Sequence, residues 1–498
     1  MSAALRATTD AVTLTSPLLT LWLLLPYLAG FVAALLPVIA RQLVLLCCLV
    51  SGAVAAAALR SGEQGAVLLN LLGPTGVRLS VDPLAGWFVM LAALLLAAVL
   101  LSCWQRVSGT AMPLLLLVLL GGLNTAFAAV DLISIYVTLE VVGISAFLLI
   151  LRERSDRSLW IALRYLLVSN TAMTLYLIGA GLVYAQSGSF AIAALAPLPL
   201  GAAQAFVLLG LLTKAGVFIS GLWLPRTHAE APPEISALLS GVVVTAGAVP
   251  LLRLAQLDPR LLVVLQAVGV SSALLGVVAA LGASDVKRLL AWSTLSQMGL
   301  VLLSPVAAGA MAFSHGLAKA VLFLLAGRLP SRQLDGWHER ALPLGLQLAL
   351  WGASLSLVGV PPLLGFAAKK DLQETLPPPL AAAVVVLSLG TAMVFARLWG
   401  APLEPAARTP AFLPPSLQLA VAPLLLTLLL AGCWQLRSGI SAAAWLTSAA
   451  LLAVAVVLQR LIESRSTPLA WRDNLQDLLG NLALLGSGLL LALRLGVS

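Results

Sequence analysis

Apolar runs of about twenty residues recur from one end of this 498-residue chain to the other. Each run is long enough to cross the hydrocarbon core of a bilayer as a helix. A backbone in lipid must satisfy its own hydrogen bonds, so such runs fold as helices that pack together. Only 9% of the residues are charged, against about 25% in ordinary soluble proteins. The sequence therefore predicts an all-α fold, a polytopic membrane helical bundle of about 14–16 transmembrane helices.

The apolar runs can be placed residue by residue, and three polar connections separate them. Residues 61–84 read as a short external hairpin, 328–345 as the most polar cytoplasmic connection, and 401–411 as a Pro-rich linker before the last helices. We expect spans near 19–40, 42–59, 85–103, 112–129, 132–151, 160–184, 203–222, 235–252, 261–281, 290–306, 310–327, 346–367, 380–400, 412–434, 441–460 and 475–496.

The distribution of positive charge gives the orientation. Lys and Arg outnumber Asp and Glu by 28 to 19, for a net charge of +9. With the expected spans, most of them fall on one side, which the positive-inside rule makes cytoplasmic, so both termini are placed outside. The basic balance therefore signals orientation and, secondarily, attraction to the lipid surface; we expect no nucleic-acid partner. Members of the basic side include Arg41, Arg106, Arg152, Arg154, Arg157, Arg226, Lys287, Arg288, Arg328, Arg332 and Arg340.

A few charges lie inside the apolar runs, where they are expensive. Glu140 and Lys214 are each the only charge deep in their runs, and His315 and Lys319 share another. Lys369 follows a double proline. A charge at the bilayer centre costs about 2.5–3.5 kcal/mol on insertion scales, so such residues usually mark an ion or proton path. The sequence thus predicts movement of protons or cations across a membrane.

No cofactor or metal site is expected. Cys47, Cys48, Cys103 and Cys433 lie in or beside apolar runs, without a CxxC pair or a His/Cys cluster. Buried cysteines of this kind usually act as small hydrophobes. The glycine-rich signatures of nucleotide-binding loops are missing as well. Any redox chemistry would belong to another subunit of an assembly, so whether the chain counts as part of an enzyme stays open.

Three segments carry a resemblance to a known family. The segment TKAGVFISGLWLPRTHAEAPPEISALLSG at 213–241 resembles the signature of the antiporter-like subunits shared by respiratory complex I, its photosynthetic relatives and Mrp-type cation/proton antiporters. SDVKRLLAWSTLSQMGLVLL at 284–303 and SHGLAKAVLFLLAG at 314–327 resemble later family segments in the same order. The resemblance covers about residues 115–400, the family's core.

The resemblance implies roles for the buried charges. Glu140 matches the family's fifth-helix glutamate, and Lys214 matches the seventh-helix lysine paired with it. His315 and Lys319, four residues apart and so on one helical face, match a central polar axis for protons. Lys369 matches the residue that ends this axis on the twelfth helix, with Lys370 as the exposed neighbour. Separation of Glu140 from Lys214 would then make the lysine release its proton; a static ion pair that fastens two helices is the alternative.

The family fold implies a division of the chain. Residues 1–111 would form N-terminal transmembrane helices, 112–400 the proton-translocating core, and 401–498 peripheral transmembrane helices. The resemblance implies two inverted five-helix repeats, at about 112–253 and 261–400, which the raw sequence does not reveal. Helix breaks are expected in the seventh and twelfth helices, at Pro225 and at Pro361 with Pro362, because broken helices at matching points of two repeats point to a transport site.

The chain departs from the family pattern at its eighth helix. Thr245 stands where relatives commonly carry a lysine or histidine. A threonine hydroxyl can bridge a water chain but cannot hold a proton near neutral pH. Two interpretations follow. Either a water relay at Thr245 joins Lys214 to His315, or the channel is inactive and the chain is a scaffold subunit.

The resemblance favours a membrane subunit of an Mrp-type monovalent cation/proton antiporter, closest to the D type among the Mrp subunits. The alternative is a proton-pumping subunit of an NADH- or ferredoxin-quinone oxidoreductase of the complex I type. Either function implies neighbouring membrane subunits, the lipid bilayer and H+ as partners, with Na+ as the exchanged ion of the antiporter. The expected location is a bacterial-type plasma membrane or a thylakoid membrane.

Overall fold

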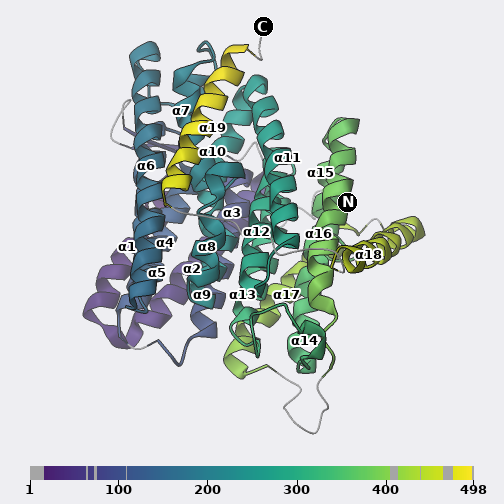
Figure 1. Ribbon diagram of the computed structural model, residues 1–498. Helices are drawn as coiled ribbons and strands as arrows, with labels where there is room; N and C mark the ends of the chain where they lie inside the picture. The colour runs from purple at the N-terminus through teal and green to yellow at the C-terminus, as the bar shows by residue number, and fades with distance from the viewer. Residues whose placement is uncertain are drawn as a thin grey trace, which may run out of the picture.

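The computed structural model describes residues 16–62, 66–71, 76–107, 109–403, 413–437, 439–463 and 475–495. In these residues, thirteen helices are long and apolar enough to cross a membrane, or up to fourteen if one bent pair counts as a single span. The predicted all-α membrane bundle is therefore confirmed (Figure 1). Two expected spans contain only short helices, because one run folds as a 16-residue helix and another is divided by a break.

The elements follow one another in this order. The N-terminal part contains α1 (Ser16–Leu35), α2 (Ala40–Ser61), β1 (Val67–Leu71), β2 (Val77–Val81) and α3 (Pro83–Ser102). The central part contains α4 (Ala111–Ala128), α5 (Leu132–Leu151), α6 (Asp156–Ser187), α7 (Ala202–Lys214), η4 (Phe218–Gly221), α8 (Leu224–Glu230), α9 (Pro233–Leu238), η5 (Leu239–Val243), α10 (Thr245–Leu257), α11 (Pro259–Leu281), α12 (Val286–Val301) and α13 (Ala308–Ala326). The remainder contains α14 (Leu344–Val358), α15 (Leu364–Glu374), α16 (Pro378–Trp399), α17 (Pro415–Gln435), α18 (Ala442–Glu463) and α19 (Leu475–Leu495).

Short polar side chains set where many helices begin. The carboxylates of Asp82, Asp131, Asp258 and Asp285 accept hydrogen bonds from the first backbone amides of α3, α5, α11 and α12. Ser155 forms a reciprocal capping pair at the start of α6. Such caps satisfy amides that have no partner inside the helix. The sequence thus fixes the helix starts at the ends of the apolar runs.

The connection at 61–84, expected as an external excursion, contains a hairpin formed by the pairing of β1 with β2. The two strands are antiparallel, with Val67 opposite Val81. The hairpin leads into α3 through Asp82, whose Oδ2 lies 2.6 Å from Nη1 of Arg253 on α10. Arg253 also donates to the carbonyl of Phe127 at the end of α4, at 3.0 Å. This ion pair holds the hairpin against the central helices.

The centre of the bundle is formed by two fully buried spans. One is the continuous α9–η5–α10 rod, and the other is α13. Polar side chains on these helices face other helices, whereas the apolar faces of outer helices such as α1, α2 and α6 are exposed toward lipid. Within the rod, η5 is a π-helical turn, a distortion that often lies at functional sites. The sequence predicts an ordinary helix there.

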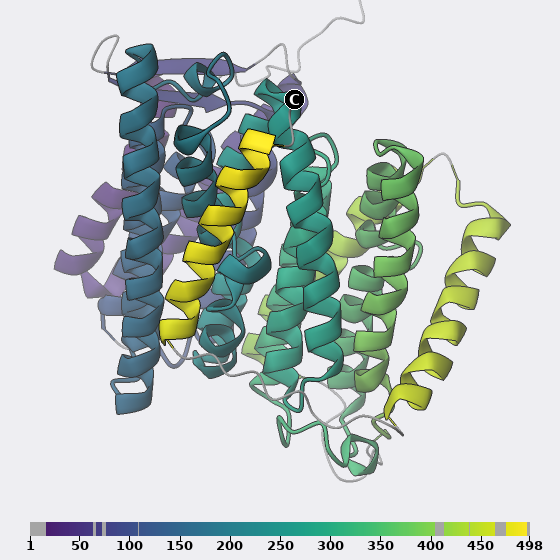
Figure 2. The ribbon, with the colours of Figure 1, turned by 45° about the horizontal axis from the view of Figure 1, so that its top comes forward.

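The two helices nearest the C-terminus separate from each other. Helix α18 packs against α16, whereas α19 packs against α6, α7 and η4 at another side of the bundle (Figures 1 and 2). The buried residues of α19 are leucines at helical spacing, namely Leu478, Leu482, Leu485, Leu489 and Leu493. Gly486 lets α19 approach Leu209 of α7, since an added Cβ would lie 3.0 Å from Leu209 Cδ2.

The break in the seventh span lies before the residue that the sequence pointed to. Helix α7 ends at Lys214, and the chain bends by 42° between 202–214 and 218–230. Gly216 and Phe218 both have positive φ, +65° and +53°, which a right-handed helix cannot contain. The prediction of a break at Pro225 is therefore wrong: Pro225 lies in the first turn of α8, where a missing amide hydrogen has no cost.

The second break separates α14 from α15. Gly359, at φ +92°, ends α14, and Pro361 and Pro362 lie in the connection. Helix α15 then carries Lys369 on its buried side. The chain is therefore interrupted next to a buried lysine in two different places.

Candidate functional site

Lys214 and Glu140 lie within ion-pair distance, as the sequence predicts. Lys214 is the last residue of α7 and is 9% exposed. Its Nζ lies 3.5 Å from Oε1 of Glu140 on α5 and donates to the carbonyl of Leu139 at 3.0 Å. The first separation is long for a hydrogen bond, so the carboxylate is held mainly by charge attraction. Such a pair can open without breaking a tight hydrogen bond.

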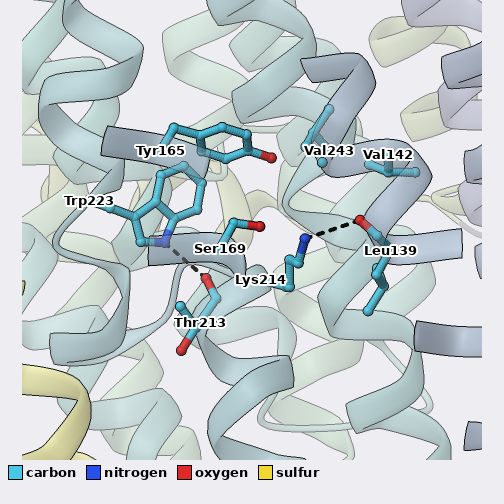
Figure 3. Close-up of a pocket in the computed structure, with 9 residues that line it drawn as sticks. Leu139, Val142, Tyr165, Ser169, Thr213, Lys214, Trp223 and Val243 are labelled. Carbon is cyan, nitrogen blue, oxygen red and sulfur yellow. Dashed lines mark hydrogen bonds between the residues drawn. The ribbon is translucent and has the colours of Figure 1, made fainter. Parts of the chain in front are cut away.

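A small cavity with a mainly apolar lining and a few polar groups adjoins the ammonium of Lys214 (Figure 3). Its lining includes Tyr165 and Ser169 of α6 and Trp223, which precedes α8. Trp223 packs against Tyr165 with ring centroids 5.2 Å apart and donates from Nε1 to the carbonyl of Thr213 at 2.9 Å. The same carbonyl also accepts from the backbone amide of Gly216 at 3.1 Å, so the indole adds a second hydrogen bond at the end of α7. Trp223 thus stabilises the break after α7, and the hydroxyls of Tyr165 and Ser169 lie on the same cavity as Lys214.

The π-helical turn lies between Lys214 and His315. Val243 at its end lines the Lys214 cavity, and the carbonyl of Ser240 lies 3.3 Å from Nε2 of His315. The hydroxyl of Ser240 lies 2.6 Å from Oγ1 of Thr294 on α12. The π-helical turn therefore contacts the Lys214 cavity through Val243 and His315 through Ser240. Sequence reasoning missed Ser240, although it belongs to the SALLSG end of the family signature.

The hydroxyl of Thr245, at which the sequence suggested a water relay, forms a hydrogen bond within its own helical rod. Thr245 is fully buried, and its hydroxyl donates to the carbonyl of Val242 at 2.6 Å. This bond uses the proton of the hydroxyl within its own helix. Gly247, two residues further on, packs α10 tightly on α7, since an added Cβ would lie 2.4 Å from the amide nitrogen of Ala215.

His315 and Lys319 both lie buried on α13, as expected from their spacing. Lys319 donates to the carbonyl of Leu290 at 2.6 Å and to the hydroxyl of Ser293, both on α12. Its Nζ also lies 5.6 Å from the ring centre of Phe395 on α16, within the range of a cation–π contact. No carboxylate lies within ion-pair distance of Lys319 in the described residues. The charge of Lys319 is stabilised by the carbonyl of Leu290, the hydroxyl of Ser293 and the ring of Phe395.

Lys369 is the buried member of the lysine pair on α15. It is 5% exposed and donates to the carbonyl of Val358, the last residue of α14, at 3.0 Å. Lys370 is exposed and lies 3.8 Å from Glu374. The hydroxyl of Ser356 on α14 lies 3.3 Å from the hydroxyl of Ser314, which precedes His315. Serines thus connect the α13 pair to the second break.

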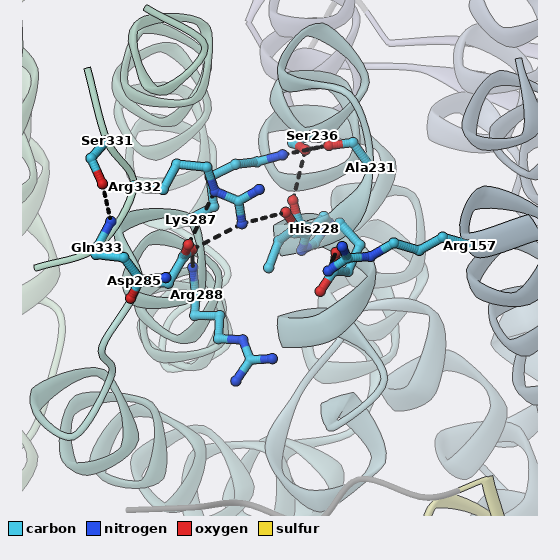
Figure 4. A network of polar contacts seen from close by, with 12 residues as sticks. Arg157, His228, Ala231, Ser236, Asp285, Lys287, Arg288, Ser331, Arg332 and Gln333 are labelled. Atoms are coloured by element: carbon cyan, nitrogen blue, oxygen red, sulfur yellow. Dashed lines mark hydrogen bonds and ion pairs between the residues drawn. The ribbon is translucent and has the colours of Figure 1, made fainter. Parts of the chain in front are cut away.

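A second polar cluster lies where α8 meets α12 (Figure 4). Lys287 is 2% exposed and donates to the carbonyl of Ala231. The sequence placed Lys287 outside the spans, among the basic residues of the cytoplasmic side, but it is buried in the first turn of α12, where the carbonyl of Ala231 accepts its hydrogen bond. Asp285 binds Arg332 through an ion pair of 3.0 Å, and Arg288 is exposed.

His228 is another buried residue that the sequence reasoning passed over. It is fully buried on α8, and neither ring nitrogen has a hydrogen-bond partner among the described residues. The rings of Trp223 and Phe323 lie about 6 Å away, at 6.0 and 6.1 Å. The signal was present as the histidine of the signature at 213–241.

The arrangement contains groups for proton transfer and none for metal binding. The described residues hold no group of three or more His, Cys, Asp or Glu that fits a metal ion. The buried lysines and histidines instead lie next to serine hydroxyls and carbonyl oxygens, which can orient water and ammonium groups. A row of such groups runs from α5 through α7, η5 and α13 to α15.

Comparison with known proteins agrees with this geometry. A family model described as NADH:quinone oxidoreductase/Mrp antiporter, transmembrane, matches residues 129–393. The N subunit of the NADH-quinone oxidoreductase of Desulforudis audaxviator is 32% identical over 440 residues, which cover 78% of this chain and 85% of the relative. The D-type component of the Na(+)/H(+) antiporter of Alkalihalophilus pseudofirmus is 29% identical over 336 residues, which cover 60% and 67%.

The fold is shared more widely than the sequence. A chain of the membrane-bound sulfane sulfur reductase, an archaeal respiratory membrane complex, superposes with a TM-score of 0.75 at 20% identity. The match covers 94% of this chain and all of that one, at 100%. The family match spans more than half of the sequence and includes every buried charge from Glu140 to Lys369. This polytopic integral membrane protein therefore belongs to the NADH:quinone oxidoreductase/Mrp antiporter family.

Proposed function

We propose that this chain moves protons across a membrane along its buried row of lysines and His315, as an antiporter-like subunit of a larger assembly. The observation that carries the proposal is the pair of Glu140 and Lys214, 3.5 Å apart beside the break in the seventh span. A buried lysine paired with a half-buried carboxylate at a helix break is more typical of a transport site than of a structural fastening. Lys214 is the last residue of α7, so the charged side chain lies directly at the break in the span.

Opening of the pair is the proposed trigger. With Glu140 close, the ammonium of Lys214 is stabilised by an opposite charge in a low-dielectric surrounding. When Glu140 moves away, only the carbonyl of Leu139 remains, and a desolvated ammonium with one neutral partner releases its proton. The proton then passes by water and hydroxyl groups beside the π-helical turn toward His315 and Lys319. Lys369 is the last titratable group of the row.

The relay that we propose uses the π-helical turn in place of a residue at Thr245. The carbonyl of Ser240 faces His315, and its hydroxyl faces Thr294. The hydroxyl of Thr245 is directed to its own helix. The scaffold interpretation remains the competing function, and this inward bond of Thr245 is the observation in its favour.

Two assemblies fit the chain. The relative from the Na(+)/H(+) antiporter supports the Mrp type, in which proton movement is exchanged for a monovalent cation. The relative from the NADH-quinone oxidoreductase supports the complex I type, in which quinone reduction elsewhere drives the protons. We keep the D type of the Mrp antiporters as the working function. Purification of the assembly through a tag on this chain identifies its partner subunits and separates the two.

The decisive experiment replaces Lys214 in the assembled complex. Lys214→Ala removes the titratable group without adding bulk, so we expect loss of ion-coupled transport in vesicles with assembly unchanged. The matched control is Lys370→Ala, because Lys370 is exposed and outside the row; its transport should equal the unmodified complex. Full transport in Lys214→Ala would contradict the trigger and support the scaffold function.

A further inference from the structure

Ser169 departs from the usual behaviour of hydroxyl residues in helices. Its side chain is buried, 5% exposed, and its Oγ has no hydrogen-bond partner among the described residues. On the same helix, Thr171 and Thr174 donate to the carbonyls of Leu167 and Asn170, four residues back, at 2.8 and 2.9 Å. That backward bond is the ordinary solution for Ser and Thr in helices. Ser169 instead directs its hydroxyl toward the Lys214 cavity (Figure 3).

Gly143 lies where the polar part of this cavity's lining converges. A Cβ added at Gly143 would lie 2.9 Å from Nζ of Lys214, 3.5 Å from Oγ of Ser169 and 3.9 Å from the hydroxyl of Tyr165. Three polar side-chain ends from α6 and α7 therefore converge over the bare side of one glycine on α5. Because Gly143 has no side chain, the space between them stays open.

Other buried glycines of the same helices serve close packing instead. A Cβ at Gly179 would lie 2.8 Å from the amide nitrogen of Val207, and one at Gly210 would lie 2.9 Å from the carbonyl of Ala172. In both cases backbone atoms are among the nearest neighbours, so the glycine lets two helices touch. At Gly143 the nearest atoms are the ends of polar side chains. Its small size keeps a polar space open.

The size of the space fits one water molecule. The cavity lined by Gly143, Tyr165, Ser169 and Lys214 provides about 10 Å³ for water centres. A buried water needs about 10–15 Å³ by this measure and two to four polar partners. The three converging groups supply the partners, and the hydroxyl of Ser169 has no other partner among the described residues. Volume and chemistry agree on a single occupant.

We propose that one water molecule is bound over Gly143 by Ser169, Tyr165 and Lys214, and that it is the first acceptor of the Lys214 proton. This site rests on the proposed function of Lys214. An N–H of the ammonium donates to the water oxygen, and the water donates to the hydroxyl oxygens of Ser169 and Tyr165. When Glu140 withdraws, one N–H bond breaks and its electron pair stays on nitrogen. The proton forms a new O–H bond, which leaves a neutral amine and a hydronium ion. Ser169 and Tyr165 are positioning residues in this step.

The test removes the two hydroxyls and keeps the shape of the site. In the full assembly, Ser169→Ala with Tyr165→Phe deletes two partners of the water, while the ring of residue 165 still packs on Trp223. We expect transport to fall about tenfold or more, as when a well-placed hydrogen bond is lost. We also expect the loss of an infrared O–H band that shifts in H₂¹⁸O. Thr171→Val is the control, because that hydroxyl is satisfied within its own helix, and it should leave both readouts unchanged.

The outcomes separate this site from the function on which it rests. An inactive Lys214→Ala together with a fully active double variant would overturn the water site alone. An active Lys214→Ala would overturn the proposed function itself. A high-resolution map of the unmodified assembly with no density between Lys214 and Ser169 would also overturn the water site. Should the double variant fail to assemble, Ser169→Ala alone carries the same test, since it removes one oxygen atom and adds none.

Discussion

The buried lysines at the two helix breaks, Lys214 and Lys369, have different polar partners. Lys214 precedes its break and has both a carboxylate, at 3.5 Å, and a carbonyl, at 3.0 Å. Lys369 follows its break and has only the carbonyl of Val358, at 3.0 Å, with no carboxylate within ion-pair distance among the described residues. The first lysine can be switched by moving one partner inside the chain. The second has no such partner here, so its charge must respond to something further along the row.

Glu140→Gln should remove the difference between the two breaks, and we expect the largest effect from it. The amide keeps the shape of the carboxylate but cannot hold a charge, so Lys214 loses its switch and transport should be abolished in vesicles. Because one interaction is involved, Glu140→Gln combined with Lys214→Ala should be no worse than either change alone. Transport in Glu140→Gln at the rate of the unmodified complex would contradict the switch.

Lys369→Gln tests the other side of the comparison, and a somewhat smaller loss is expected. The glutamine can still donate to the carbonyl of Val358 but carries no proton for release. Transport should fall by roughly 10²-fold, within the range for loss of one proton-transfer group, while the amount of assembled complex stays constant. The exposed neighbour provides the control, Lys370→Gln, which should match the unmodified complex. Equal rates in both variants would remove Lys369 from the row.

The backbone at the first break can be tested by Gly216→Ala. Gly216 has φ +65°, and an added Cβ would lie 2.6 Å from Cδ1 of Leu224. The left-handed conformation alone should cost about 1–2 kcal/mol of stability for a residue with a side chain. Thermal unfolding of the detergent-purified assembly measures this loss. Gly181→Ala is the control, because its added Cβ would meet no atom within 4 Å; equal stability of the two variants would contradict strain at Gly216.

Thr245→Val should have the smallest effect. One of the two interpretations of the sequence, a water relay at this residue, requires a large loss of transport. Because the hydroxyl donates to the carbonyl of Val242, we expect the valine variant to keep at least about half of the activity, since a surplus hydroxyl-to-backbone bond contributes only modestly. Transport rates in vesicles decide this. A severe loss would restore the relay at Thr245 and remove the reason to place it beside Ser240.

Composition and motif were enough to predict the bundle and the pairing of Glu140 with Lys214. The position of the first break was not predictable from proline, because Gly216 and Phe218 create it through backbone conformation. The π-helical turn at 239–243 could not be predicted from its sequence, LSGVV, because these residues suit a regular α-helix equally well. Burial of Lys287 depends on the carbonyl of Ala231, 56 residues away in sequence. Such features arise only when distant segments meet.

The position of α19 has a consequence for the order of synthesis. Its leucines cover α7 and η4, the segments that flank the first break. The ribosome produces α7 long before residues 475–495 exist, so during most of membrane insertion this side of the broken helix faces lipid or a chaperone. The packing around the first break is therefore completed late. A nascent chain released before α19 would lack the leucine-rich helix that covers α7 and η4 on either side of this break.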